Sequence, residues 1–238
     1  MQRYFIKEEQ IKDNLITISD SDFHHIKNVM RFKVGSELVV ITYTGKSYLT
    51  VLSCFEKNSV ILNIKEALKT INNTLNVTLA QALIKRDKFE LVLQKTTELG
   101  VKEIIPLKTK NSIIKIDNFD KKKLRYETIV KEASEQSERN KVPKIHDLLD
   151  IKSLPYENYD YVFTAYARKN SKSLLGEIRT IDSSKSVLVL IGPEGGFDKA
   201  EIEYLESRSK IISLGNTILR SETAAIYFLS AIRLIWEN

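Results

Sequence analysis

Three of the eight glycines in the chain fall within five residues, in the segment Gly192-Pro193-Glu194-Gly195-Gly196. This segment, called here the glycine loop (residues 192–196), follows an apolar run and precedes a helix that Asp198 and Glu201 would cap as a capping box. Glycines at a strand-to-helix turn let the backbone approach a ligand closely. Open sheets bind ligands at the carboxyl ends of their strands. The loop therefore has the composition and position of a binding loop, although a tight structural turn would also use glycines.

The glycine spacing narrows the class of ligand. It differs from the Gly-x-Gly-x-x-Gly spacing of dinucleotide-binding folds. It is not a phosphate loop either, because no Gly-Lys-Ser/Thr follows. Glu194 stands inside the loop and would repel a phosphate. A ligand that is positively charged or free of phosphate fits better. S-adenosylmethionine, with a sulfonium and an ammonium, is compatible.

A second segment has the same placement, at the end of an apolar run and at the start of a helix. We call it the arginine loop (residues 214–220); its sequence is Leu214-Gly215-Asn216-Thr217-Ile218-Leu219-Arg220. Two loops that follow two strands and lead into two helices would converge on one cleft. Glu222 follows, and an acid in a first helical turn also complements the helix dipole without any functional role.

The elements that must position these loops lie after a polar linker at residues 69–74. Apolar runs predict strands, and longer periodic segments predict helices, so this part of the chain is α/β with a parallel sheet. The predicted strands are 77–83, 104–107, 161–165, 187–191 and 211–214; the predicted helices are 87–99 (with Gly100 as C-cap), 120–140 and 222–237.

Residues 1–68 are mostly of strand type, with β-branched and aromatic runs. We predict strands at 3–7, 15–18, 37–43, 47–53 and 59–64, and one short helix at 22–32 capped by Ser19, Asp20 or Ser21. Short strands joined by turns indicate a small barrel. The expected domains are 1–70 and 71–238.

The final predicted helix is apolar around nearly its whole circumference. An ordinary surface helix has one apolar stripe, so this one should be covered on two sides. A second subunit is the simplest cover, with Trp236 and Phe228 as anchors. A helix inside the core is the alternative.

Composition limits the partners and the chemistry. The net charge is +6 and the pI about 9.1, which favours an anionic partner such as nucleic acid, although a lysine-rich composition alone would give the same charge. Cys54 is the only cysteine and there are three histidines, so metal chemistry is not expected. No apolar run approaches 18 residues and no secretory signal is visible, so we expect a cytoplasmic protein without a membrane span.

Five segments together resemble one family. The two loops, with Phe197 and with Glu222-Thr223-Ala224, resemble the cofactor half of the SPOUT superfamily of knotted methyltransferases. Residues 24–31, 95–101 and 131–139 with Pro143 narrow the resemblance to the 16S ribosomal RNA uracil-N3 methyltransferases, or ribosomal RNA small subunit methyltransferase E. The departures are small: Met30 stands where the family usually has Leu, and Tyr126 where it usually has Trp.

The resemblance implies a PUA-like RNA-binding barrel joined to a SPOUT α/β domain with a deep trefoil knot at about residues 190–225. It also implies a homodimer and a 16S ribosomal RNA or small-subunit substrate. The two loops would hold S-adenosylmethionine in a bent shape. The expected cofactor-binding residues are Gly192, Pro193, Glu194, Gly195, Gly196, Leu214, Gly215, Ile218, Leu219, Arg220 and Thr223.

Methylation of uracil N3 needs an accessible base, loss of the N3 proton and a methyl donor in line. Arg220 is the catalytic candidate, because its guanidinium would stabilise negative charge on the uracil oxygens. The candidates for RNA contacts are Arg3, His24, Arg31, Lys85, Arg86, Lys88, Gln136 and Arg139.

Several of these residues have plainer interpretations. Arg31 would also favour the end of a helix. Gln136 and Arg139 share a predicted helical face with Glu132, but Glu135 and Arg139 have the spacing of a surface ion pair. Adjacent His24 and His25 point about 100° apart on a helix and cannot share a metal.

Three other functions remain open on sequence alone. The chain could be a SPOUT enzyme with another target atom or RNA. It could be a non-catalytic RNA-binding protein whose glycine loop is structural, or a nucleotide-binding enzyme. Binding of S-adenosylmethionine against ATP separates these classes.

Overall fold

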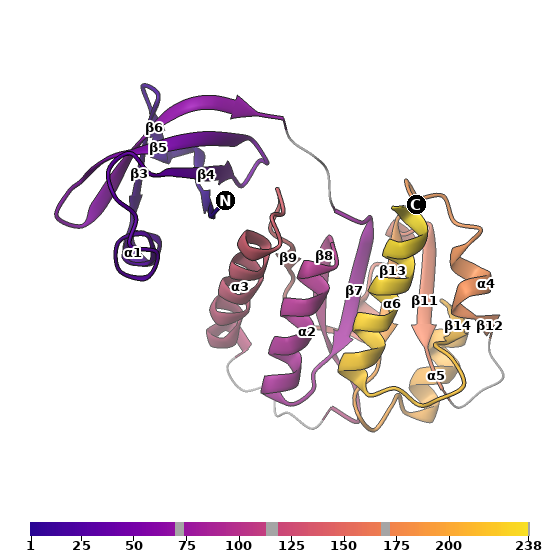
Figure 1. Cartoon of the computed structure of the whole chain (residues 1–238). Helices are drawn as coiled ribbons and strands as arrows, with labels where there is room; N and C mark the ends of the chain where they lie inside the picture. The colour runs from indigo at the N-terminus through magenta and orange to yellow at the C-terminus, as the bar shows by residue number, and fades with distance from the viewer. Residues whose placement is uncertain (70–73, 113–118, 168–171, 238) are drawn as a thin grey trace. The chain divides into compact units, whose positions relative to one another are not determined.

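A computed structural model describes residues 1–69, 74–112, 119–167 and 172–237, which form two compact units (Figure 1). The first unit comprises Met1–Asn73 and Ser134–Val142, and the second comprises Thr74–Ala133 and Pro143–Asn238. The sequence analysis placed residues 134–142 with the second domain, whereas the structure groups them with the first. Most of the expected linker lies outside the described residues.

The first unit is built on a six-stranded sheet. Its strand order is β1 (Arg3–Ile6), β4 (Glu37–Thr42), β5 (Ser47–Phe55), β6 (Ser59–Leu68), β3 (Leu15–Ser19) and β2 (Ile11–Lys12). β1 pairs with β4 in parallel and the other neighbours are antiparallel. Buried side chains from β1, β3, β4, β5 and β6 form one core cluster, so the sheet curls around a common interior as a small barrel does.

One helical segment interrupts these strands. It runs through α1 (Asp20–His24) and a π-helical turn (His25–Val29), so it begins two residues before the predicted start and ends three before the predicted end. Arg31 adopts a left-handed backbone with φ +52°, which cannot continue a right-handed helix. The His25 ring nitrogen Nδ1 lies 2.8 Å from the hydroxyl of buried Tyr4, which ties the segment to β1.

The second unit contains a parallel sheet of eight strands. Its order is β10 (Leu149–Asp150), β8 (Glu103–Lys108), β7 (Val77–Ala82), β13 (Val187–Ile191), β11 (Tyr161–Ala165), β14 (Lys210–Ser213) and β12 (Lys172–Ser173), with β9 (Lys144–Ile145) beside β8. All pairs are parallel. Every residue of β13 is buried, as its continuous apolar run predicts for a strand covered on both faces.

Helices cover both faces of this sheet. They are α2 (Arg86–Glu98), α3 (Phe119–Gln136), α4 (Leu174–Ile178), α5 (Lys199–Glu206) and α6 (Ser221–Trp236). α2 and α6 pack against each other (Figure 1), while Ile202 and Leu205 of α5 join a separate core cluster with Leu188 and Leu190. Among the described residues, no helix combines the length and apolarity needed to span a bilayer.

Two predicted details of these helices are wrong. α3 ends at Gln136, not at Asn140, and Glu138 beyond it has φ +56°, so Arg139 does not share the helical face of Glu132 and Gln136. Phe228 of α6 is fully buried and packs on Phe163, with ring centroids 6.2 Å apart, so it belongs to the core of the subunit.

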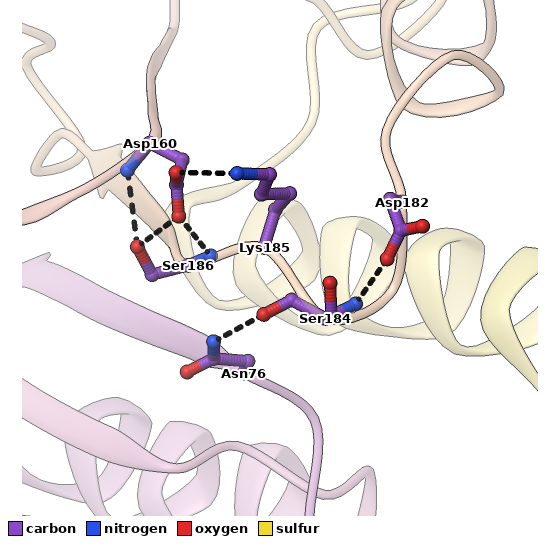
Figure 2. A network of polar contacts seen from close by, with 6 residues as sticks. All are labelled: Asn76, Asp160, Asp182, Ser184, Lys185 and Ser186. Atoms are coloured by element: carbon purple, nitrogen blue, oxygen red, sulfur yellow. Dashed lines mark hydrogen bonds and ion pairs between the residues drawn. The ribbon is translucent and has the colours of Figure 1, made fainter.

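A polar network ties together the amino ends of three central strands (Figure 2). Asp160, just before β11, accepts hydrogen bonds from the Ser186 amide (2.9 Å) and hydroxyl (2.8 Å) just before β13, and it pairs with Lys185. These bonds, those from Ser186 foremost, lower the pKa of Asp160 to about 2. Asn76, before β7, donates to the Ser184 carbonyl. The network fixes the strand starts at the edge of the sheet opposite the loops described next.

Candidate functional site

The carboxyl ends of β7, β13, β11 and β14 meet at one edge of the sheet, because these four strands are neighbours and parallel. A pocket of about 540 Å³ lies at this edge. Its lining comes from the segments that follow the four strands, including the glycine and arginine loops, and from the first turns of α2 and α6. This is the position at which open α/β sheets bind ligands.

The glycine loop is held by side chains from outside it. Asn111, after β8, donates a 3.0 Å hydrogen bond from Nδ2 to the Gly196 carbonyl. A Cβ atom on Gly195 would come within 3.2 Å of the Asn111 Cβ, closer than most side chains tolerate. Gly196 has φ +70°, which favours glycine. The loop thus needs glycine for its backbone conformation at one position and for close packing at another.

The helix that follows the glycine loop is anchored as predicted. Asp198 is the N-cap of α5 and forms a capping box with Glu201, whose Oε2 accepts from the Asp198 amide at 2.8 Å. Lys110 adds an ion pair to Asp198 at 2.9 Å and donates its own amide to Glu201. The Lys110 ammonium is the main reason why the pKa of Asp198 is lowered. The far end of the loop is therefore fixed.

The arginine loop presents both apolar and charged groups to the pocket. Gly215 has φ +124°, and the Ser213 hydroxyl donates to its carbonyl at 2.9 Å. Ile218 lines the pocket yet is 77% exposed, so a ligand there would remove apolar surface from water. Arg220 is the N-cap residue of α6, lines the pocket, and makes no side-chain hydrogen bond to another described residue. Its guanidinium is therefore available to a substrate.

Charges of both signs line the pocket. Lys85, Lys88 and Arg220 are the cations, and Glu194 and Glu222 are the carboxylates. Glu222 is 7% exposed, and its nearest cation is Lys88 at 3.9 Å. The pocket thus offers carboxylates to a cationic group and cations to developing negative charge. No group of acidic, histidine and cysteine side chains suited to a metal ion occurs in the described part of the chain.

Most of the expected cofactor-binding residues line this one pocket. Gly195 and Thr223 do not: Gly195 packs on Asn111, and Thr223 lies exposed within α6. The lining also includes residues that the sequence analysis did not assign to the cofactor, namely Lys85, Lys88, Ala165, Tyr166, Ala167, Ile191, Phe197, Ser213, Thr217, Ser221, Glu222 and Ala224. The sequence contained a signal for Ala165 and Tyr166, because Ala165 ends a predicted strand of the same sheet and Tyr166 directly follows it.

The RNA candidates fall into two groups. His24, Arg31, Gln136 and Lys85 are exposed, and Lys88 is half-buried at the pocket. The others are engaged within the protein: Arg3 pairs with Glu138 at 2.8 Å, Arg86 pairs with Glu90 at 2.8 Å, and Arg139 is 2% exposed. Arg139 was predicted as a phosphate contact; its burial does not favour that role, which stays a prediction.

Family models match both parts of the chain. One described as an RNA methyltransferase domain matches residues 71–233, and one described as an RNA methyltransferase PUA domain matches residues 18–65. The ribosomal RNA small subunit methyltransferase E of Bacillus subtilis is 36% identical, over 98% of this chain and 96% of the relative. The chain belongs to the ribosomal RNA small subunit methyltransferase E family.

Two solved methyltransferase structures are also similar to this chain. One, the family's enzyme from Neisseria gonorrhoeae bound to S-adenosyl methionine, is 29% identical with a TM-score of 0.86, over 99% of this chain and 98% of that one. The other, a methyltransferase from Legionella pneumophila with bound cofactor SAM, is 29% identical with a TM-score of 0.87, over 98% of this chain and 96% of that one. The similarity to both structures covers both units of this chain.

Proposed function

We propose that this protein methylates N3 of a specific uridine in 16S ribosomal RNA, with S-adenosylmethionine as the methyl donor. One observation supports the proposal: two glycine-bearing loops converge on one pocket at the carboxyl edge of the sheet, together with Arg220, whose side chain has no partner among the described residues. Membership of the ribosomal RNA small subunit methyltransferase E family supplies the reaction class and the RNA.

The pocket suits S-adenosylmethionine by size and chemistry. A volume of about 540 Å³ is within the range of small-molecule sites. Exposed Ile218 and partly buried Leu214 and Leu219 offer apolar surface, while Glu194 and Glu222 offer negative charge to the ammonium or sulfonium. The bound cofactor supplies an electrophilic methyl group, and the protein supplies its orientation.

Arg220 serves the substrate in this mechanism. When the N3 proton leaves, negative charge spreads onto the two uracil oxygens. A guanidinium at the pocket rim stabilises that charge through fixed donors. The exposed cations Arg31 in the first unit and Lys85 in the second bind RNA phosphates, so both units contribute to the grip on the substrate. Because the substrate is ribosomal, we place the protein in the cytoplasm.

We also propose that residues 190–225 form the trefoil knot of a SPOUT domain. The strand order supports it: β13 lies between β7 and β11, β14 lies beyond β11, and α6, which follows β14, returns to pack on α2. The chain must therefore cross back over the sheet edge, where the two loops face the same pocket.

The first prediction tests the cofactor site. Gly195→Val should abolish S-adenosylmethionine binding in calorimetry, because the new side chain displaces Asn111 and with it the glycine loop. The wild type should bind S-adenosylmethionine and not ATP. Gly176→Ala, at an exposed position of α4 that does not line the pocket, is the control and should bind normally. Wild-type affinity in a folded Gly195→Val protein would contradict this site, and ATP binding would favour a nucleotide enzyme.

The second prediction separates catalysis from RNA binding. Arg220→Ala should slow single-turnover methylation by roughly 2–4 kcal/mol of barrier, the range for loss of an oxyanion donor, with little change in RNA affinity. Arg31→Ala should instead weaken RNA binding and reduce its log–log salt slope by about one. Methylation by Arg220→Ala at the wild-type rate would remove that residue from the mechanism.

We propose that α6 forms a homodimer interface. Phe228 and Ile232 face the subunit core, but Leu234 and Tyr227 of the same helix are 68% and 47% exposed. Trp236, the other predicted anchor, is partly buried, and its helical spacing places it on the side of Phe228 and Ile232, away from Leu234 and Tyr227. Large apolar side chains left in water on one helix are typical of an interface.

The third prediction follows from this face. Leu234→Glu should convert a dimer into a monomer in light scattering at micromolar concentration, because it places a charge in an apolar contact. Leu124→Glu is the matched control, since Leu124 of α3 is 70% exposed, and it should leave the mass unchanged. A wild-type monomer would refute the dimer.

A further inference from the structure

Gln81 is an unexpected residue for its position. It lies near the carboxyl end of β7, a strand whose residues are all buried, and it is 0% exposed. Its neighbour in the sheet is Ile191 of β13. The side-chain Oε1 is buried and has no hydrogen-bond partner among the described residues. An unpaired buried acceptor destabilises a fold, and an apolar side chain would avoid this penalty.

The other end of the amide begins a chain of hydrogen bonds. Gln81 Nε2 donates to the Ser221 hydroxyl at 2.9 Å, and that hydroxyl donates to the Gly192 carbonyl at 2.6 Å. The carbonyl can only accept, so the Ser221 oxygen is left to accept from Gln81. Nε2 also donates to the Ala82 carbonyl at 3.1 Å. The amide orientation is therefore set by the network, and Oε1 is left as the atom without a partner.

The hydrogen-bond chain Gln81–Ser221–Gly192, called here the Gln81 relay, joins three parts of the site. Gly192 is the first residue of the glycine loop, and Ser221 directly follows the arginine loop and begins α6. Both line the pocket, whereas Gln81 stands behind it in β7. The relay thus crosses between two loops that are separated in sequence and fixes each of them to the sheet.

We propose that Gln81 is a positioning residue of the cofactor site: through Ser221 it sets the spacing between the glycine and arginine loops around S-adenosylmethionine. This inference rests on the proposed function only in the identity of that ligand. The unpaired Oε1 is then a stability penalty tolerated for binding, as functional sites often show.

The test is calorimetry with S-adenosylmethionine, together with melting temperatures, on a small set of variants. Gln81→Met keeps the volume and removes the amide, Ser221→Ala removes the middle of the relay, and the double variant completes a cycle. Ser221→Thr restores the hydroxyl. Thr96→Val is the matched control, because it removes another fully buried hydroxyl, bonded to the Val92 carbonyl at 2.7 Å, away from the pocket.

We expect Gln81→Met and Ser221→Ala each to raise the dissociation constant about tenfold, as expected for lost hydrogen bonds in a pre-organised site. The double variant should bind no worse than the weaker single one. Ser221→Thr, which keeps a hydroxyl, should bind more tightly than Ser221→Ala, and Thr96→Val should bind like the wild type. Gln81→Met should melt no lower than the wild type, which a purely structural role would not allow.

Wild-type affinity in Gln81→Met, or effects of the two single variants that multiply in the double, would overturn the relay. If Gln81→Met fails to fold, the affinity of Ser221→Ala is the test instead. Wild-type affinity in Ser221→Ala would then overturn the relay. Failure of the wild type itself to bind S-adenosylmethionine is a separate outcome, because it refutes the proposed function and removes the basis of the inference.

Discussion

Parallel pairing of β7, β13, β11 and β14 is the constraint on which the rest of the second unit depends. Parallel strands all end at the same edge, so the chain leaves four neighbouring strands in one small region. α2, α5 and α6 begin at that edge, with their free backbone amides directed toward it. A pocket there is lined mainly by residues of the loops that follow these strands, which explains why glycines are prominent in it beside the cations Lys85, Lys88 and Arg220.

A pocket made of loops must be stiffened from outside. Asn111 holds the carbonyl of Gly196, Lys110 supports the cap of α5, and Ser221 holds the carbonyl of Gly192. At the opposite edge, the Asp160 network aligns the strand starts. The binding loops are thus fixed at both ends while their middle stays exposed, which leaves Ile218 and Arg220 free to meet ligands.

Much of this was predictable from local sequence. β11 and β13 begin and end at the predicted residues, because a continuous apolar run between polar turns defines both ends of a strand. The capping box of Asp198 and Glu201 was also predicted correctly from the sequence. The residues expected to line the pocket were predicted from the family resemblance. The position of the pocket was predicted because open α/β sheets bind ligands at the carboxyl ends of their strands.

What the sequence did not reveal depends on contacts between distant segments. Arg139 looked like a surface cation, but a left-handed turn at Glu138 ends the helix and Arg139 is buried. Phe228 looked like an interface anchor until Phe163 was placed against it. The Gln81 relay joins residues 140 positions apart, and no local sequence pattern predicts it.

The central claim is that this pocket methylates N3 of a uridine in 16S ribosomal RNA. The most direct measurement is nucleoside mass spectrometry of 16S ribosomal RNA from cells that lack the protein, with the wild type or Arg220→Ala restored on a plasmid. The account predicts that N3-methyluridine disappears in the deletion, returns with the wild type and stays largely absent with Arg220→Ala. An unchanged level of N3-methyluridine in the deletion, or loss of a different modified nucleoside, would contradict it.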